Sequence, residues 1–237
     1  MVFTGSVFLY LFLPLFLAVY HLLPGTGQPP RARLAWVLAA SWVFYGWWRP
    51  DFLALMVAAA CWTWLAGRWI DRRKGDDRGA RTVLGLAVGL DLVVLGYFKY
   101  FNFGVESLNA LLSALGARPF SAWQVVLPVG ISFYLFHSIS YLVDVHRRQA
   151  PPASSFLELA CYLTMFPQLL SGPLIRYQDL GPQLREPVSS FPMFSEGAGR
   201  FMAGFCKKVL VAGGGPAGLE ACEKAGRPRP PALLVKI

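Results

Sequence analysis

The sequence predicts an all-α fold, a polytopic membrane bundle of about six spanning helices with further amphipathic helices at the membrane interface. Apolar residues make up 55% of the 237 positions and charged residues only 15%, whereas soluble domains carry about a quarter charged residues. The mean hydropathy is +0.46. Apolar runs of about 15 to 22 residues recur along the chain, and about 20 such residues cross a bilayer core of roughly 30 Å.

The same composition excludes disordered, collagen-like and disulfide-rich classes. A net charge of +9 would suggest nucleic acid in a soluble protein. Here six of the 22 basic residues fall between apolar runs, from Arg68 to Arg81, as topological charge does. We therefore predict no nucleic-acid partner. The four cysteines form no metal-ligand spacing, so neither a metal site nor a bound cofactor is predicted.

Six apolar runs are the predicted spans, and the lipid bilayer is the first predicted partner. They are Phe3–Leu23, Leu34–Trp48, Phe52–Ile70, Thr82–Phe101, Gln124–Val145 and Phe156–Ile175. A signal peptide is disfavoured for the first run because no Lys or Arg follows Met1 and the run is too long. The last run contains Pro167 and Gly172-Pro173, which favours a broken or re-entrant helix.

Two further segments are amphipathic and are predicted to lie at the membrane surface. They are Val105–Leu115 and Phe191–Ala212. With the amino terminus outside, the inner loops carry ten basic residues and the outer loops three. Because basic loops stay in the cytoplasm, the sequence predicts an outside amino terminus and a cytoplasmic loop over residues 72–81.

Four motif segments carry a family resemblance. They are Phe44–Pro50, Phe98–Phe103, Leu127–Val145 and Phe166–Tyr177. In this order and spacing they resemble the amino-terminal half of the membrane-bound O-acyltransferases, in the branch that contains the bacterial alginate O-acetyltransferase membrane subunit. The resemblance covers roughly residues 1–212, whereas residues 213–237 are predicted to be a divergent, disordered tail.

The resemblance implies a multi-pass enzyme of the bacterial inner membrane. It would take an acyl group from cytoplasmic acetyl-CoA or another thioester and pass it through a central tunnel to hydroxyls of an exported polysaccharide such as alginate. An extracytoplasmic acetyltransferase protein is the implied partner. The catalytic histidine of the family lies in a later Trp-His-Gly segment that this sequence does not contain. The catalytic residue is therefore unknown, and this chain alone is expected to be inactive.

Mid-span polar residues are the candidates for the wall of such a tunnel. Gly130, His137, Tyr141 and Asp144 fall on one stripe at helical spacing, and a polar stripe in a span faces a bundle interior or a water-filled cavity. A helix–helix hydrogen bond is an equally good explanation. Asp91, in the middle of its own span, fits either a proton or acyl pathway or a pairing with a neighbouring helix.

The broken segment supplies four more candidates: Gln168, Gly172, Pro173 and Arg176. Gln168 offers hydrogen-bond donors and an acceptor, Gly172 permits a close approach, and Arg176 suits an anionic group. By resemblance this segment borders the reaction tunnel. The alternative is a Pro-Gly break that only packs against other helices.

A glycine-rich stretch near the carboxyl end also resembles a dinucleotide-binding fingerprint. Gly213, Gly215 and Gly218 are in register for it, but only 19 residues follow and no second strand can form. We interpret the stretch as a departure of the reading frame from the family near Gly213. A transporter or channel is the alternative function, since intramembrane ionisable groups and a broken helix also suit a substrate path. A flavin- or NAD-binding protein comes third.

Overall fold

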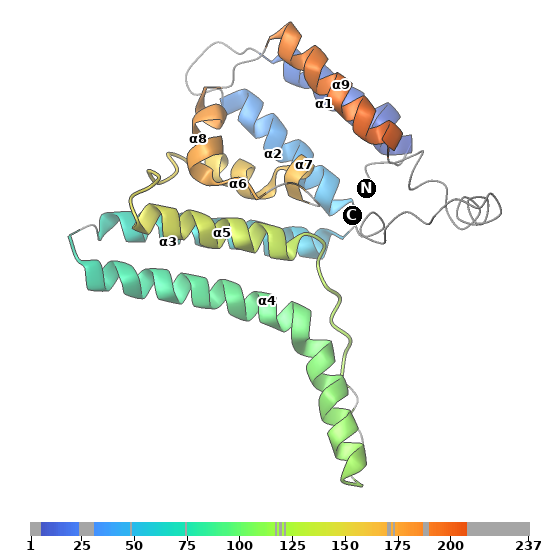
Figure 1. Ribbon diagram of the computed structural model, residues 1–237, viewed down its shortest axis with the longest axis vertical. Helices are drawn as coiled ribbons and strands as arrows, with labels where there is room; N and C mark the ends of the chain where they lie inside the picture. The colour runs from blue at the N-terminus through green and yellow to red at the C-terminus, as the bar shows by residue number, and fades with distance from the viewer. Residues whose placement is uncertain are drawn as a thin grey trace, which may run out of the picture.

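All regular secondary structure in the described residues is helical, which confirms the predicted all-α class (Figure 1). The computed structural model describes residues 6–23, 31–47, 49–73, 75–116, 118, 120, 122–169, 172, 174–186 and 190–207. The elements are the π-turn η1 Phe8–Phe12 and the helices α1 Leu13–Leu22, α2 Arg31–Gly46, α3 Pro50–Arg72, α4 Asp77–Ala114, α5 Ile131–His146, α6 Phe156–Thr164, α7 Phe166–Leu169, α8 Tyr177–Arg185 and α9 Phe191–Lys207.

Among the described residues, two helices are long and apolar enough to cross a membrane. They are α3 and α4, which contain the predicted spans Phe52–Ile70 and Thr82–Phe101. Both run further than predicted toward the basic loop, so that only residues 73–76 separate them. The other four predicted spans correspond to shorter helices, and six crossings therefore stay a prediction. Pro173 and residues 213–237, including the three glycines of the fingerprint, lie outside the described residues.

The segment Val105–Leu115, predicted to be short and to lie at the membrane surface, continues α4 and is not a separate helix, and its position at the surface stays a prediction. Its residues up to Ala114 form about the last quarter of the 38-residue α4, which bends and then projects beyond its neighbours (Figure 1). At 1.5 Å per residue α4 is about 57 Å long, well beyond the bilayer core. Two asparagines explain why the projecting end keeps its order. Asn102 and Asn109, seven residues apart, bind the backbones of Val125 and Phe120 on the returning chain with two hydrogen bonds each.

Helix α5 begins at Ile131, seven residues later than the predicted start at Gln124. A turn replaces the first part of the predicted span. The Ile131 N–H donates to the Pro128 carbonyl at 3.3 Å, and Gly130 has φ 77° and ψ 0°. These angles are those of the third residue of a type II turn, which needs glycine. A methyl group on Gly130 would lie 2.7 Å from the Leu169 carbonyl oxygen, so this turn also sits directly against α7.

The predicted break in the last span is confirmed. Helix α6 ends at Thr164, Met165 adopts a non-helical conformation with ψ 121°, and α7 is a single turn that contains Pro167. Phe166 anchors this turn among four phenylalanines of η1, α1 and α2.

The helices form two groups. Helices α3, α4 and α5 lie side by side, and α2, α6, α7 and α8 cover the other face of α3 and α5 (Figure 1). The larger core lies between the groups and includes Ala66, Tyr141, Leu159, Tyr162 and Tyr177. Helix α9 has no buried residue and lies beside α1, where the rings of His21 and Phe194 are in contact. The predicted candidates of α5 and α7 thus meet at the boundary between the two groups.

Candidate functional site

The predicted polar stripe of α5 is buried against α6 and α8. His137 is only 3% exposed, and the edge of its ring faces Tyr162 of α6 with 5.4 Å between ring centroids. Its Nδ1 lies 2.7 Å from the Phe133 carbonyl oxygen, which can only accept, so Nδ1 carries the hydrogen. Nε2 is the other polar atom of the ring. It is buried and has no hydrogen-bond partner among the described residues.

Tyr141 is fully buried in the same region. Its hydroxyl accepts a hydrogen bond from the Ala153 N–H at 3.0 Å, and its ring meets the ring of Tyr177 edge to face at 5.0 Å. A methyl group on Gly67 would lie 2.8 Å from the Tyr141 ring, so α3 makes room for this tyrosine with a glycine. Asp144 is 5% exposed, and its Oδ2 has no partner in the described part of the chain.

The side chain of Gln168 replaces a backbone hydrogen bond that is lost at the break between α6 and α7. In a continuous helix the Tyr162 carbonyl would accept from the Phe166 N–H. Instead the Gln168 Nε2 donates to this carbonyl at 2.6 Å, and the Phe166 N–H donates to the Ser41 hydroxyl at 3.2 Å. Tyr162 also closes the far side of the break, because its hydroxyl donates to the Ile175 carbonyl at 3.0 Å. The side chain of Gln168 therefore has a structural use.

The remaining candidates of the broken segment differ in position. Gly172 is half-buried and lies against Gln168, where a methyl group would overlap the Gln168 Cα. Arg176 is exposed at the start of α8 and does not join the buried group. The structure thus brings His137, Tyr141 and Gln168 together around the tyrosine pair Tyr162 and Tyr177. Whether they line a passage stays a prediction.

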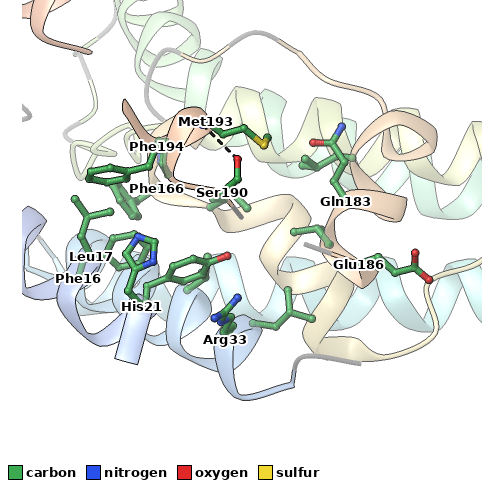
Figure 2. A pocket seen from close by; sticks show the side chains of 17 residues that line it. Phe16, Leu17, His21, Arg33, Phe166, Gln183, Glu186, Ser190, Met193 and Phe194 are labelled. Carbon is green, nitrogen blue, oxygen red and sulfur yellow. Dashed lines mark hydrogen bonds between the residues drawn. The ribbon is translucent and has the colours of Figure 1, made fainter. Parts of the chain in front are cut away.

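An apolar groove borders the other side of α7. Its volume is about 650 Å³, and its walls come from α1, α2, α8 and α9, with Phe166 and Pro167 at its base. Figure 2 shows Phe16, Leu17 and His21 on one side of this groove, near Phe194 and Phe166. Arg33 marks its polar edge, where Nε donates to the Leu23 carbonyl at 3.2 Å and the guanidinium lies over the Tyr20 ring.

Comparison with curated proteins identifies relatives of this chain. Over 212 residues, or 90% of its length, the chain is 46% identical to the protein named "Probable alginate O-acetylase AlgI" of Pseudomonas putida, and 44% identical to that of Pseudomonas aeruginosa. The chain is homologous to alginate O-acetylase AlgI. The resemblance to the membrane-bound O-acyltransferases is thereby confirmed for part of such a protein, because the matches cover 43% and 40% of these two relatives.

A more distant relative has a different polymer in its name. The peptidoglycan O-acetyltransferase of Helicobacter pylori is 25% identical over 90% of the chain, which is 44% of that relative. No protein-family model and no solved structure matches the chain. The named relatives are thus O-acetyltransferases with two different polymers in their names.

Sequence reasoning missed a buried ion pair in this part of an AlgI homologue. Glu158, 3% exposed, accepts hydrogen bonds from the Tyr177 hydroxyl at 2.5 Å and from Arg185 Nε at 2.8 Å. Burial raises the pKa of Tyr177, and the Glu158 carboxylate raises it further. Partial burial alone would lower the pKa of Arg185, but its hydrogen bonds to Glu158 and Tyr177 raise it. One signal was available, since Ser155 and Glu158 have the spacing of a capping box: the Ser155 hydroxyl accepts from the Glu158 N–H, while the Glu158 carboxylate accepts from the Ser154 N–H.

A second missed contact joins the three helices of the first group. Ser138 Oγ on α5 lies 2.7 Å from Asp91 Oδ2 on α4 and 2.7 Å from Thr63 Oγ1 on α3. The sequence placed Asp91 at mid-span without a partner. No pattern in the sequence connects three residues that lie 28 and 47 positions apart. Of the two explanations for Asp91, the pairing with a neighbouring helix is therefore observed, and the proton or acyl pathway stays a prediction.

Proposed function

We propose that this chain is part of an O-acyltransferase that acetylates hydroxyl groups of an exported polysaccharide, with alginate as the first candidate. The identity of 46% over 212 residues to an alginate O-acetylase is the observation that carries the proposal. The four motif segments all lie within residues 1–212, so they fall in the part of the chain that the resemblance covers. The acyl donor in this proposal is cytoplasmic acetyl-CoA or another thioester, and the partner is an extracytoplasmic acetyltransferase protein.

The proposed topology has six crossings of the bacterial inner membrane, with the amino terminus outside. The length and apolar character of α3 and α4 support two of these crossings. The basic residues Arg72, Arg73 and Arg78, at the end of α3, in the turn and at the start of α4, support a cytoplasmic position for this turn. Helix α9 lies flat at the interface in this arrangement, which agrees with its lack of buried residues.

The acyl path in this proposal passes the break between α6 and α7. Two observations support this position. Nε2 of His137 is buried within the group that Gln168 and Tyr162 join. The apolar groove reaches Phe166 and Pro167 on the other side of the same turn. His137 is proposed as part of the wall and not as the catalytic residue, because its position does not match the family's catalytic histidine.

A chimera tests the proposal without depending on the rest of the chain. Residues 1–212 replace the matching 212 residues of the Pseudomonas putida AlgI in a strain that lacks its own copy. We expect the secreted alginate to regain O-acetyl groups, measured by NMR or by ester release. A chimera that reaches the membrane in normal amount but leaves alginate unacetylated would contradict the proposal and would favour the transporter alternative.

Two substitutions in that chimera test the wall. His137→Phe keeps the aromatic contact with Tyr162 but removes Nε2, so we expect acetylation to fall at least tenfold with little change in membrane level. His146→Phe is the matched control, at the half-buried end of the same helix, and should leave acetylation unchanged. Full acetylation by the His137→Phe chimera would show that this ring serves only helix contact.

A further inference from the structure

The contacts of Asp91, Ser138 and Thr63 need more hydrogen atoms than the two hydroxyl groups supply. Three oxygen–oxygen distances of 2.7 Å follow one another: Asp91 Oδ2 to Ser138 Oγ, Ser138 Oγ to Thr63 Oγ1, and Thr63 Oγ1 to the Ala59 carbonyl oxygen. All three are at the preferred distance for an O–H···O hydrogen bond. Each contact needs one hydrogen between its two oxygens, so the series needs three.

Ser138 and Thr63 supply only two hydrogens, one from each hydroxyl. The Ala59 carbonyl supplies none. If Asp91 were an ionised carboxylate, two hydrogens would have to serve three contacts, and two oxygens would face each other at 2.7 Å without a hydrogen. A protonated Asp91 supplies the third hydrogen and completes the series.

The surroundings of Asp91 point the same way. The side chain is 3% exposed at the middle of a helix long enough to span a membrane. In the described part of the chain Asp91 makes no ion pair. A buried carboxylate without a cation is costly, whereas a neutral acid that donates and accepts hydrogen bonds is not.

We propose that Asp91 is a neutral carboxylic acid whose O–H starts a one-way series of hydrogen bonds through Ser138 and Thr63 to the Ala59 carbonyl. In this series Asp91 donates to Ser138, Ser138 donates to Thr63, and Thr63 donates to Ala59. The series joins α4, α5 and α3 at one level and fixes the rotation of α5. Because Ser138 follows His137 directly, the fixed rotation holds the His137 ring toward Tyr162 of α6. Asp91 is thus a positioning residue.

Infrared spectroscopy of the purified full chain in detergent tests the protonation directly. We expect a C=O stretching band of a protonated carboxylic acid at pH 7, which shifts in D₂O. Asp91→Asn should remove this band and keep the fold, because an amide N–H can donate to Ser138 in the same way. Asp51→Asn is the matched control at an exposed aspartate near the start of α3, and it should leave the band in place.

Thermal unfolding of the same samples tests whether a hydrogen-bond donor at position 91 stabilises the fold. Asp91→Asn should unfold within about 2 °C of the unsubstituted chain. Asp91→Leu, which has the same branched shape but a larger volume and no donor, should unfold roughly 2–10 °C lower, because the buried hydroxyls lose a partner. A band that persists in folded Asp91→Asn, or no such band in the unsubstituted chain, would overturn the proposal. So would an equal loss of stability in the Asn and Leu variants.

Discussion

The two groups of helices use buried polar side chains for opposite purposes. In α3, α4 and α5 the helices are continuous, so their backbone groups are satisfied internally. The buried polar side chains Thr63, Asp91 and Ser138 are then free to bind one another across helices. In α6, α7 and α8 the helix is interrupted. There the side chains of Gln168, Ser41 and Tyr162 bind backbone groups that the interruption frees.

The comparison explains why both groups can be packed in the same core. An unpaired backbone group in an apolar medium costs several kcal/mol by the usual estimate, so an interruption is tolerated only where side chains replace the lost bonds. The first group has no such demand and uses its polar residues to fix helix positions. The second group uses Gln168, Ser41 and Tyr162 to bind the backbone at the break, in addition to the side-chain contacts of Glu158 with Tyr177 and Arg185. Substitutions in the two groups should therefore fail for different reasons.

The largest effect is expected where the two groups meet, at Gly130. Gly130→Ala would put a methyl group 2.7 Å from the Leu169 carbonyl oxygen of α7, on a residue with φ 77°. The positive φ costs roughly 1–2 kcal/mol and the overlap typically 1–3 kcal/mol more, about 2–5 kcal/mol in total. Unfolding in detergent, followed by tryptophan fluorescence, measures this loss.

Gly116 provides the matched control for that substitution. It has nearly the same φ of 73°, at the end of α4, but no atom lies within 4 Å of the added methyl group. Gly116→Ala should therefore cost only the conformational part, about 1–2 kcal/mol. Equal losses for the two alanine variants would mean that the contact between the α5 turn and α7 contributes nothing.

The next effect concerns the ion pair of the second group. Glu158→Ala removes the acceptor for the Tyr177 hydroxyl, for Arg185 and for the Ser154 N–H. Loss of a buried charge partner costs 3–5 kcal/mol, but Arg185 is about a third exposed and can turn to solvent, so we expect about 2–4 kcal/mol. Proteolysis between α6 and α8 should become faster as their joint loosens.

An exposed Glu–Arg ion pair is the control for the loss of stability in Glu158→Ala. Glu196 and Arg200 form a pair one turn apart on α9, with both side chains more than half exposed. Glu196→Ala should change the stability by less than about 0.5 kcal/mol, as exposed pairs do. If Glu158→Ala changed the stability as little, the buried pair would have no role in joining α6 to α8.

The sequence predicts the helices better than their contacts. The apolar run Phe52–Ile70 and the proline at Pro167 correctly predict a long apolar helix and a break, because both depend on local properties of the chain. The end of α4 could not be predicted in the same way. Lys99 and Asn102 are typical of a membrane boundary, yet nothing local stops the helix there, and Asn102 binds a segment 23 residues later.

The residues of the candidate site are likewise predicted correctly where local spacing decides and incorrectly where tertiary contacts decide. The spacing of His137, Tyr141 and Asp144 predicts a shared buried face, and the structure places all three in the interior. Arg176 was grouped with Gln168 because they are close in sequence, but the start of α8 turns Arg176 to the outside. The pair of Glu158 and Arg185 was missed because its partners are 27 residues apart and meet only through the break.

Gln168 gives the sharpest test of the opposite uses of polar groups. Gln168→Met keeps the length of the side chain but removes the amide that donates to the Tyr162 carbonyl. The carbonyl is left unpaired beside the break, at a cost of about 1–3 kcal/mol. Gln183→Met is the control on α8, where an exposed amide donates to the Asp179 carbonyl and water can replace it. A loss for Gln168→Met no greater than for the control would mean that the break needs no side chain to satisfy it, and the difference between the two helix groups would then lie only in their lengths.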